Sequence, residues 1–179
     1  MSKNVKVGVI GVGYLGRFHA HKYAAMEDVE LVGVADADPE RAQVVAGECG
    51  TRALSDYREL IAQVDAVSIA VPTPLHHEVA KACLLHKVDV MVEKPITTTL
   101  AQADDLIELA KQHQRILQVG HLERFNPAVL AMQPLLTHPL FIEAHRIAVF
   151  KERGTDVDVV LDLMIHDIDI VLSIVKSPI

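Results

Sequence analysis

The sequence predicts an α/β fold in which helices cover both faces of a doubly wound parallel sheet. The first observation is that short apolar runs alternate with segments of helical periodicity over residues 5–119. The second is that these runs are continuous, as in residues 66–71 (Ala-Val-Ser-Ile-Ala-Val), which is typical of parallel strands buried on both faces. Together they favour repeated βα units joined by right-handed crossovers.

The expected elements follow this alternation along the chain. We expect strands at residues 5–10, 30–35, 66–71, 88–92 and 115–119. We expect helices at residues 14–25, 39–48, 75–86 and 99–112, with a short helical turn near 56–62. Asp38 before Pro39 predicts an N-cap followed by a proline in the first turn, and Thr99 is the expected N-cap of the helix that follows it.

The pattern changes after Gly120. Residues 121–126 are polar and irregular, and Pro127 can begin another helix, which Pro134 would limit. We expect a long strand at residues 140–150 and a helix from about 159 to 175. An unpaired strand of that length exposes a row of backbone donors and acceptors. Either this strand pairs with another chain, or the sequence is the front part of a longer protein. We favour the second interpretation.

Composition indicates a globular protein that binds neither nucleic acid nor membrane. Of 179 residues, 50% are hydrophobic and 23% charged, and the net charge of −7 comes with scattered Lys and Arg. The N-terminus lacks the apolar core of a signal peptide. The most apolar late segment, residues 159–175, contains four ionisable side chains, which argues against a transmembrane helix. The two cysteines form no motif, so we expect a reducing, cytoplasmic setting.

A glycine motif directly follows the first expected strand. Gly11, Gly13 and Gly16 have the spacing G-x-G-x-x-G, and Asp36 lies at the end of the second expected strand. This order of strand, glycine turn, helix, strand and acid is the fingerprint of a dinucleotide-binding Rossmann unit. Gly11 permits a tight turn, Gly13 lets the backbone approach a pyrophosphate, and Gly16 lets the helix pack closely on the sheet.

The same motif predicts NAD as the cofactor. The free N–H groups at the start of the helix, around Tyr14 and Leu15, would face the phosphates. Asp36 can accept hydrogen bonds from both hydroxyls of the adenosine ribose and would repel a 2′-phosphate. Arg41, five residues further on, keeps NADP as the less favoured alternative.

Four motifs together resemble the Gfo/Idh/MocA family of oxidoreductases. They are the glycine motif, residues 71–76 (Val-Pro-Thr-Pro-Leu-His), residues 93–95 (Glu-Lys-Pro) and residues 162–167 (Asp-Leu-Met-Ile-His-Asp). The resemblance runs from residue 5 to about residue 175. Residues 120–127 (Gly-His-Leu-Glu-Arg-Phe-Asn-Pro) further resemble a branch that oxidises nucleotide-linked amino sugars, such as UDP-N-acetylglucosamine 3-dehydrogenases.

The resemblance implies a domain plan and an activity. We expect a dinucleotide-binding Rossmann domain over residues 1–120, a connecting loop and helix over 121–138, and an incomplete start of a substrate and oligomerisation domain over 139–179. A longer form would be a homo-oligomer through the sheet of that domain. The implied function is an NAD-dependent sugar dehydrogenase acting on C3 of UDP-N-acetylglucosamine. The alternatives are an inositol or other free-sugar dehydrogenase, and a shortened NAD-binding or regulatory protein without catalysis.

Three residues are the catalytic candidates. Lys94 follows a parallel strand, where its ammonium can orient the reacting hydroxyl and favour alkoxide character; it and Glu93 are also expected beside the cofactor. Asp162 and His166 stand four residues apart on one predicted helix, so the carboxylate can orient an imidazole that accepts the hydroxyl proton. The alternatives are a solvated lysine, a buried polar pair, or a metal site completed by His121; we expect no metal.

Further candidates lie in two loops. Pro72, Thr73 and His76 follow the third expected strand and are expected beside the nicotinamide ribose, although prolines there also simply end a strand. Arg124 and Asn126 are candidates for gripping a sugar or diphosphate, because arginine forks bind phosphate well. The alternatives are a loop arginine and, for Asn126, a helix N-cap before a proline.

Overall fold

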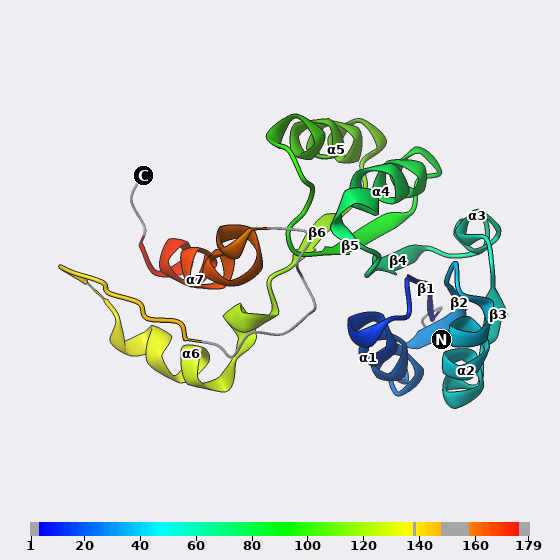
Figure 1. Cartoon of the computed structure of the whole chain (residues 1–179), viewed down its shortest axis with the longest axis horizontal. Helices are drawn as coiled ribbons and strands as arrows, with labels where there is room; N and C mark the ends of the chain where they lie inside the picture. The colour runs from blue at the N-terminus through cyan, green and yellow to red at the C-terminus, as the bar shows by residue number, and fades with distance from the viewer. Residues whose placement is uncertain (1–3, 138, 148–157, 176–179) are drawn as a thin grey trace. The chain divides into compact units, whose positions relative to one another are not determined.

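The computed structural model describes residues 4–137, 139–147 and 158–175. They belong to two units, Met1–Val119 (unit 1) and Gly120–Ile179 (unit 2). Unit 1 is a doubly wound α/β fold, as predicted: a six-stranded sheet in the order β3-β2-β1-β4-β5-β6 has helices on both faces (Figure 1). The strands are β1 Val5–Ile10, β2 Val29–Ala35, β3 Arg52–Leu54, β4 Ala66–Ile69, β5 Asp89–Glu93 and β6 Leu117–Gly120.

The helices of unit 1 begin where the sequence predicts them. They are α1 Tyr14–Ala24, α2 Pro39–Cys49, α3 Tyr57–Ile61, α4 His76–Leu85 and α5 Leu100–His113, with a 3₁₀ turn, η1 Thr73–Leu75, before α4. The two predicted N-caps are confirmed: the Asp38 side chain accepts from the backbone N–H groups of Glu40 and Arg41, and Thr99 accepts from that of Gln102. Strand β3 was not predicted, because its three residues, two exposed and one half-buried, form no apolar run.

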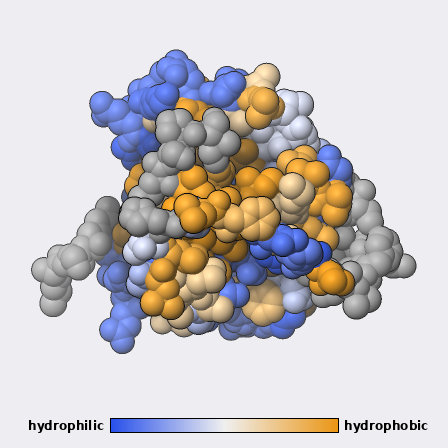
Figure 2. All heavy atoms as spheres, turned by 90° about the vertical axis from the view of Figure 1, so that its left-hand side faces the viewer, coloured by the Kyte–Doolittle hydropathy of each residue, from blue (hydrophilic) through white to orange (hydrophobic). Residues whose placement is uncertain are grey.

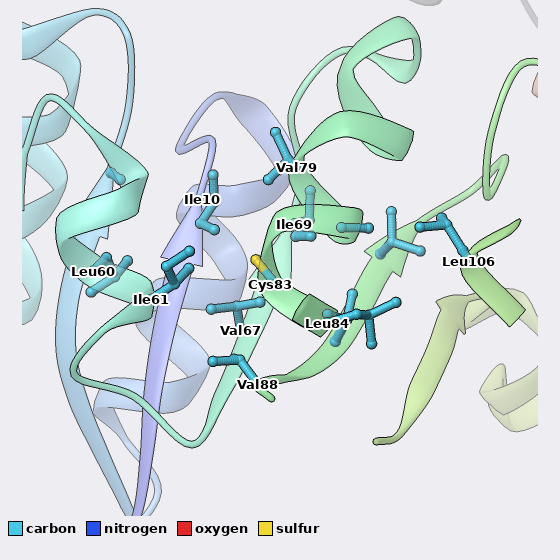
Figure 3. Packing of buried hydrophobic residues seen from close by; sticks show 14 of the residues in the cluster. Ile10, Leu60, Ile61, Val67, Ile69, Val79, Cys83, Leu84, Val88 and Leu106 are labelled. Carbon is cyan, nitrogen blue, oxygen red and sulfur yellow. The ribbon is translucent and has the colours of Figure 1, made fainter. Parts of the chain in front are cut away.

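Apolar clusters lie on both faces of the sheet. Residues that alternate along β1 divide between them, with Val9 packing toward α1 and α2, while Ile10 packs toward the opposite face. On that face Val67 and Ile69 of β4 belong to one apolar cluster with side chains of α3, α4 and α5, and Figure 3 shows part of this cluster. Burial on both faces explains why the strands read as continuous apolar runs.

Close packing at the centre of the sheet depends on two glycines. Gly8 and Gly33 are register neighbours on β1 and β2. A Cβ added at Gly8 would lie 2.7 Å from a Leu60 methyl carbon, and one at Gly33 would lie 3.3 Å from another. Leu60, which is fully buried, therefore fills the space that the two missing side chains leave.

Unit 2 contains short helical elements. They are η2 Leu122–Phe125, α6 Pro127–Met132, η3 Gln133–Leu135, the π-helical turn η4 Val160–Met164, and α7 Ile165–Ile174. The helix predicted from about residue 159 is confirmed, with its first turn wound as a π-helix. The strand predicted at residues 140–150 is wrong over 140–147, where the described residues form no strand, because an extended segment needs a hydrogen-bonding partner to become one. Residues 148–150 lie outside the described part.

Unit 2 exposes many large apolar side chains. Leu135, Leu140, Phe141 and Ile147 are each at least 80% exposed. Figure 2 shows hydrophobic residues over much of the face that it presents. None of the helices in the described ranges combines the length and the hydropathy that crossing a membrane requires.

Candidate active site

The glycine loop lies where the order of the strands reverses. The chain runs from β1 outward to β2 and β3, then crosses back so that β4 lies on the other side of β1. The loop after β1 contacts the end of β4: Gly11 has φ +82°, and a Cβ there would lie 2.8 Å from backbone atoms of Ala70. Open α/β sheets bind ligands in the crevice at this reversal, beyond the carboxyl ends of the strands.

The three glycines of the motif face different surroundings. A Cβ at Gly16 would lie only 1.8 Å from the carbonyl oxygen of Gly11, so helix and loop touch backbone to backbone. A Cβ at Gly13 would meet nothing within 4 Å. Gly13 is also the N-cap of α1, where no side chain caps the helix and no acid occupies the first turn. The loop therefore offers an open surface at the positive end of a helix, which suits an anion.

Asp36 is fixed at the end of β2. Its Oδ2 accepts a hydrogen bond from the N–H of Val12 at 2.8 Å, and its Oδ1 accepts one from the N–H of Asp38 at 2.9 Å. Arg41 approaches the same carboxylate, with Nη1 3.2 Å from Oδ1, and also pairs with Asp38 at 3.1 Å. The Asp36 carboxylate thus joins the glycine loop to β2, and a cation lies beside it.

His76 ties together the segments that follow β4 and β5. Its ring is 1% exposed; Nδ1 lies 2.8 Å from the carbonyl oxygen of Pro95, and Nε2 lies 2.9 Å from that of Val71. A neutral imidazole donates from one nitrogen at a time, so one of these contacts is the hydrogen bond for a given tautomer. His76 thus holds this loop in place through its ring. Thr73 is buried beside it in η1, and Pro72 is exposed.

Lys94 directly follows β5 at the same edge of the sheet. It is half-buried, its bond to Pro95 is cis, and its backbone N–H lies 3.3 Å from Oε2 of the buried Glu93 carboxylate. The predicted position at the carboxyl end of a parallel strand is therefore confirmed. The structure brings Glu93, Lys94 and the His76 loop together at this strand end.

The sequence analysis missed two buried polar residues behind Lys94. His19, on α1, places Nδ1 2.6 Å from Oγ of Ser68 and Nε2 3.1 Å from Oε1 of Glu93. The second contact is close enough for an ion pair when the ring is protonated, but it does not meet the geometry of a hydrogen bond. A signal was present in the sequence, because Ser68 interrupts an apolar run and Glu93 ends another.

The remaining candidates lie in unit 2. Asp162 belongs to the π-helical turn and His166 to the first turn of α7, and both are half-buried. The Asn126 side chain accepts a hydrogen bond from the N–H of Ala128 at 3.0 Å, as an N-cap does. Lys94 belongs to unit 1, whereas Asp162 and His166 belong to unit 2. Among the described residues, no three His, Cys, Asp or Glu side chains form a group that could hold a metal.

Two arginines bind acids of α7. Arg124 grips the buried carboxylate of Asp169 with Nε, at 3.0 Å, and with Nη2. Arg146 holds Asp167 in the same way, with distances of 2.9 and 2.8 Å. These hydrogen bonds raise the pKa of Arg124 and lower the pKa of Asp167. Arg124 therefore has a structural partner, and only its other N–H groups are available to a ligand.

The order of the sheet, the glycine loop at its reversal and the acid after β2 define a dinucleotide-binding protein of the Rossmann class. A family model described as "Oxidoreductase family, NAD-binding Rossmann fold" (GFO_IDH_MocA) matches residues 5–121. The chain therefore belongs to the Gfo/Idh/MocA oxidoreductase family.

Individual relatives include two kinds of dehydrogenase. UDP-N-acetylglucosamine 3-dehydrogenase from Acidithiobacillus ferrooxidans is 45% identical over 170 residues, which cover 94% of this chain and 54% of that protein. A crystal structure of that enzyme, GnnA, matches with a TM-score of 0.91 and 43% identity, covering 98% of this chain and 58% of the other. Inositol 2-dehydrogenase from Acidothermus cellulolyticus is 33% identical, covering 94% of this chain and 53% of that protein.

A third relative was solved with the nucleotide. GenD2 from gentamicin A biosynthesis, in complex with NAD, matches with a TM-score of 0.73 and 27% identity, covering 76% of this chain and 40% of the other. The chain spans about half the length of the curated relatives that it matches.

Proposed function

We propose that this chain serves an NAD-dependent dehydrogenase that oxidises a ring hydroxyl of a sugar or nucleotide sugar, with C3 of UDP-N-acetylglucosamine as the preferred target. One observation carries the proposal: an open glycine loop and Lys94 lie at the same carboxyl edge of one parallel sheet. The 45% identity to a UDP-N-acetylglucosamine 3-dehydrogenase supports the choice of substrate.

The residues of unit 1 fit NAD. The N–H groups around Tyr14 and Leu15 would receive the pyrophosphate above Gly13, where the backbone leaves open space. Asp36 would accept hydrogen bonds from the adenosine ribose, and Arg41 lies beside it. The loop with Pro72, Thr73 and His76, together with Glu93 and Lys94, would line the nicotinamide end. When bound, the nicotinamide ring supplies the hydride acceptor.

The protein must hold the sugar and remove one proton. The Lys94 ammonium would hydrogen-bond the reacting hydroxyl and favour negative charge on its oxygen. His166 would accept the proton, and Asp162 would orient the imidazole or bind a neighbouring hydroxyl. Arg124 and Asn126 would contact the sugar or diphosphate through donors that their structural contacts leave over.

The Asp36 carboxylate favours NAD over NADP. Its side chain is 7% exposed and both oxygens already accept backbone hydrogen bonds, so it cannot turn away from a 2′-phosphate. Replacing Asp36 by Ser should therefore lower NADH affinity and shift the preference toward NADPH by about tenfold or more, because Arg41, no longer paired with Asp36, would lie beside the phosphate. Equal NADH and NADPH affinities in the unchanged chain would contradict the preference.

Two alternatives follow from the comparisons. The 33% identity to an inositol 2-dehydrogenase keeps a free cyclitol or sugar as the second substrate class. Because the chain spans about half of its relatives, an NAD-binding or regulatory role without turnover is the alternative of another class. We further propose a reducing, cytoplasmic setting, since both cysteines are free, and homo-oligomers through the second-domain sheet of a longer form.

The test uses the 179-residue chain itself. Calorimetry should detect NADH binding, and a panel of UDP-sugars, inositols and free sugars should produce NADH absorbance for one class only. Lys94→Ala should abolish turnover while NADH still binds, whereas Lys111→Ala, an exposed lysine on α5, should change neither. Binding without turnover on any sugar would favour the regulatory alternative. Turnover retained by Lys94→Ala would remove Lys94 from the mechanism.

A further inference from the structure

We propose that His19 and Ser68 are positioning residues that act on Lys94 through the buried carboxylate of Glu93. The inference deepens the proposed function and rests on it for the role of Lys94. The contacts through which they would act all lie within unit 1. Helix α1, whose start faces the expected pyrophosphate, is thereby connected to the strand end that presents Lys94.

Strand alternation puts the three side chains on one face of the sheet. Ser68 pairs in register with Met91, and Glu93 is two residues beyond Met91, so Ser68 and Glu93 point to the same side. Their neighbours Val67 and Val92 point into the opposite cluster, toward α4 and α5. The side with Ser68 and Glu93 is therefore the one that α1 covers, and His19 descends from that helix between them.

The cluster is buried and bridged by one imidazole. His19 is 9% exposed, Glu93 5%, and Ser68 fully buried. The imidazole touches the hydroxyl with one nitrogen, at 2.6 Å, and lies 3.1 Å from the carboxylate with the other. Tyr23, one turn further along α1, has a side-chain hydrogen bond with Ser68, and burial raises the pKa of that phenol. The cluster thus runs from Tyr23 to Glu93 without an exposed member at its centre.

Stability alone does not explain this cluster. Burying a carboxylate and an imidazole costs solvation energy, and apolar side chains of similar size fill a core at least as well. The carboxylate instead reaches the reactive residue, because Glu93 Oε2 receives the N–H of Lys94 at 3.3 Å. On the other side of Lys94, the carbonyl of Pro95 lies 2.8 Å from the buried ring of His76. Buried histidines therefore support the backbone on both sides of Lys94.

The decisive measurement is amide hydrogen exchange, followed by NMR on the 179-residue chain. His19→Ala should release Glu93 and raise the exchange rate of the Lys94 amide about tenfold. This factor corresponds to the net free energy of one hydrogen bond. Ser68→Ala, a smaller change, should raise it in the same direction. The amides of β4 should change less than about twofold. His19→Gln, whose amide can still bridge both partners, should restore most of the protection.

A matched control comes from a second histidine–carboxylate contact. His77 Nε2 lies 2.7 Å from Asp105 Oδ2 and joins α4 to α5 without contacting Glu93. His77→Ala should leave the Lys94 amide unchanged. The proposal is overturned if the Lys94 amide exchanges at the unchanged rate in His19→Ala and Ser68→Ala. It is equally overturned if all amides of the sheet accelerate together, since that shows a merely structural role.

Turnover separates this inference from the proposed function. His19→Ala should lower kcat and leave KM for NAD unchanged, because it acts through Lys94 and not on the nucleotide. A raised KM for NAD with an unchanged kcat would contradict the inference. If the unchanged chain shows no turnover, or Lys94→Ala keeps it, the proposed function fails, and hydrogen exchange still decides whether His19 positions Lys94.

Discussion

Gly13 and Gly16 are three residues apart, and the structure predicts opposite consequences for replacing each by Ala. The added Cβ at Gly16 would lie 1.8 Å from the Gly11 carbonyl oxygen, far inside any normal contact, and the obstacle is backbone that cannot rotate away. The added Cβ at Gly13 would meet open space. Gly16→Ala should therefore destabilise the fold. Gly13→Ala should leave the fold intact and weaken only the binding of a ligand that occupies this space.

The magnitudes follow from these contacts. Forcing a methyl group into packed backbone costs about 3 kcal/mol or more, which lowers the melting temperature of a chain of this size by about 6–12 °C. Gly13→Ala should cost at most about 1 kcal/mol, because alanine is a poorer N-cap than glycine. If the pyrophosphate lies over the loop, the same methyl group should weaken NADH binding by about 1–3 kcal/mol, or about 5- to 150-fold in Kd.

Circular dichroism melts and NADH titrations measure the two effects separately. The chain contains no tryptophan, so the fluorescence of bound NADH is observed without overlap from that residue. Gly47→Ala, in the last turn of α2 where an added Cβ also meets open space, is the matched control and should lose neither stability nor affinity. Unchanged NADH affinity in Gly13→Ala would show that the pyrophosphate does not lie on this loop. An unchanged melting temperature in Gly16→Ala would refute the close approach of helix and loop.

Three further predictions concern stability and reactivity. Leu60→Ala should cost about 3–5 kcal/mol in denaturant unfolding, because that side chain fills the space over two glycines. Burial raises the pKa of the Cys83 thiol to about 12, so a chromogenic thiol reagent should label Cys49 in the native chain and reach Cys83 only on unfolding. Arg146 lowers the pKa of Asp167, so Asp167→Asn should lower the free energy of unfolding by up to about 1 kcal/mol near neutral pH. The difference between the two proteins should disappear once acid has protonated the Asp167 carboxyl of the unchanged chain. Equal acid sensitivity of both proteins would contradict this.

The sequence predicted the elements of unit 1 because strong local signals agree with the tertiary structure there. Continuous apolar runs mark strands covered on both faces, and Asp38 and Thr99 cap the helices that they precede. The short edge strand β3 carries no such signal. Residues 140–147 of the expected strand have the right pattern, but in the described part of the chain they pair with no strand, and strand formation depends on a neighbour that a local pattern cannot supply.

The site residues also fall into those that the sequence predicts and those that it does not. The glycines and Asp36 were predictable because their spacing encodes a backbone geometry. Lys94 was predicted from its neighbours in sequence. Ser68 and Glu93 break apolar runs, which is a signal, but their contact with His19 was not predictable, because they lie 49 and 74 residues away and meet it only across the assembled sheet. Arg124 was assigned to a ligand from its chemistry alone, and its bond to Asp169, 45 residues away, was equally invisible.

The placement of the buried polar side chains indicates that the core of unit 1 serves more than stability. Among the described residues those of this unit are His19, Ser68, Thr73, His76, Glu93 and Thr97. They lie on β4 or β5, just beyond the ends of these strands, or on α1 above them, while the rest of the core is apolar. Since each buried polar group costs free energy that an apolar one would not, a core selected for stability alone would scatter or remove them. Their concentration around the ends of β4 and β5 is what we expect of a site whose geometry must be held, and it supports the proposal that Lys94 belongs to that site.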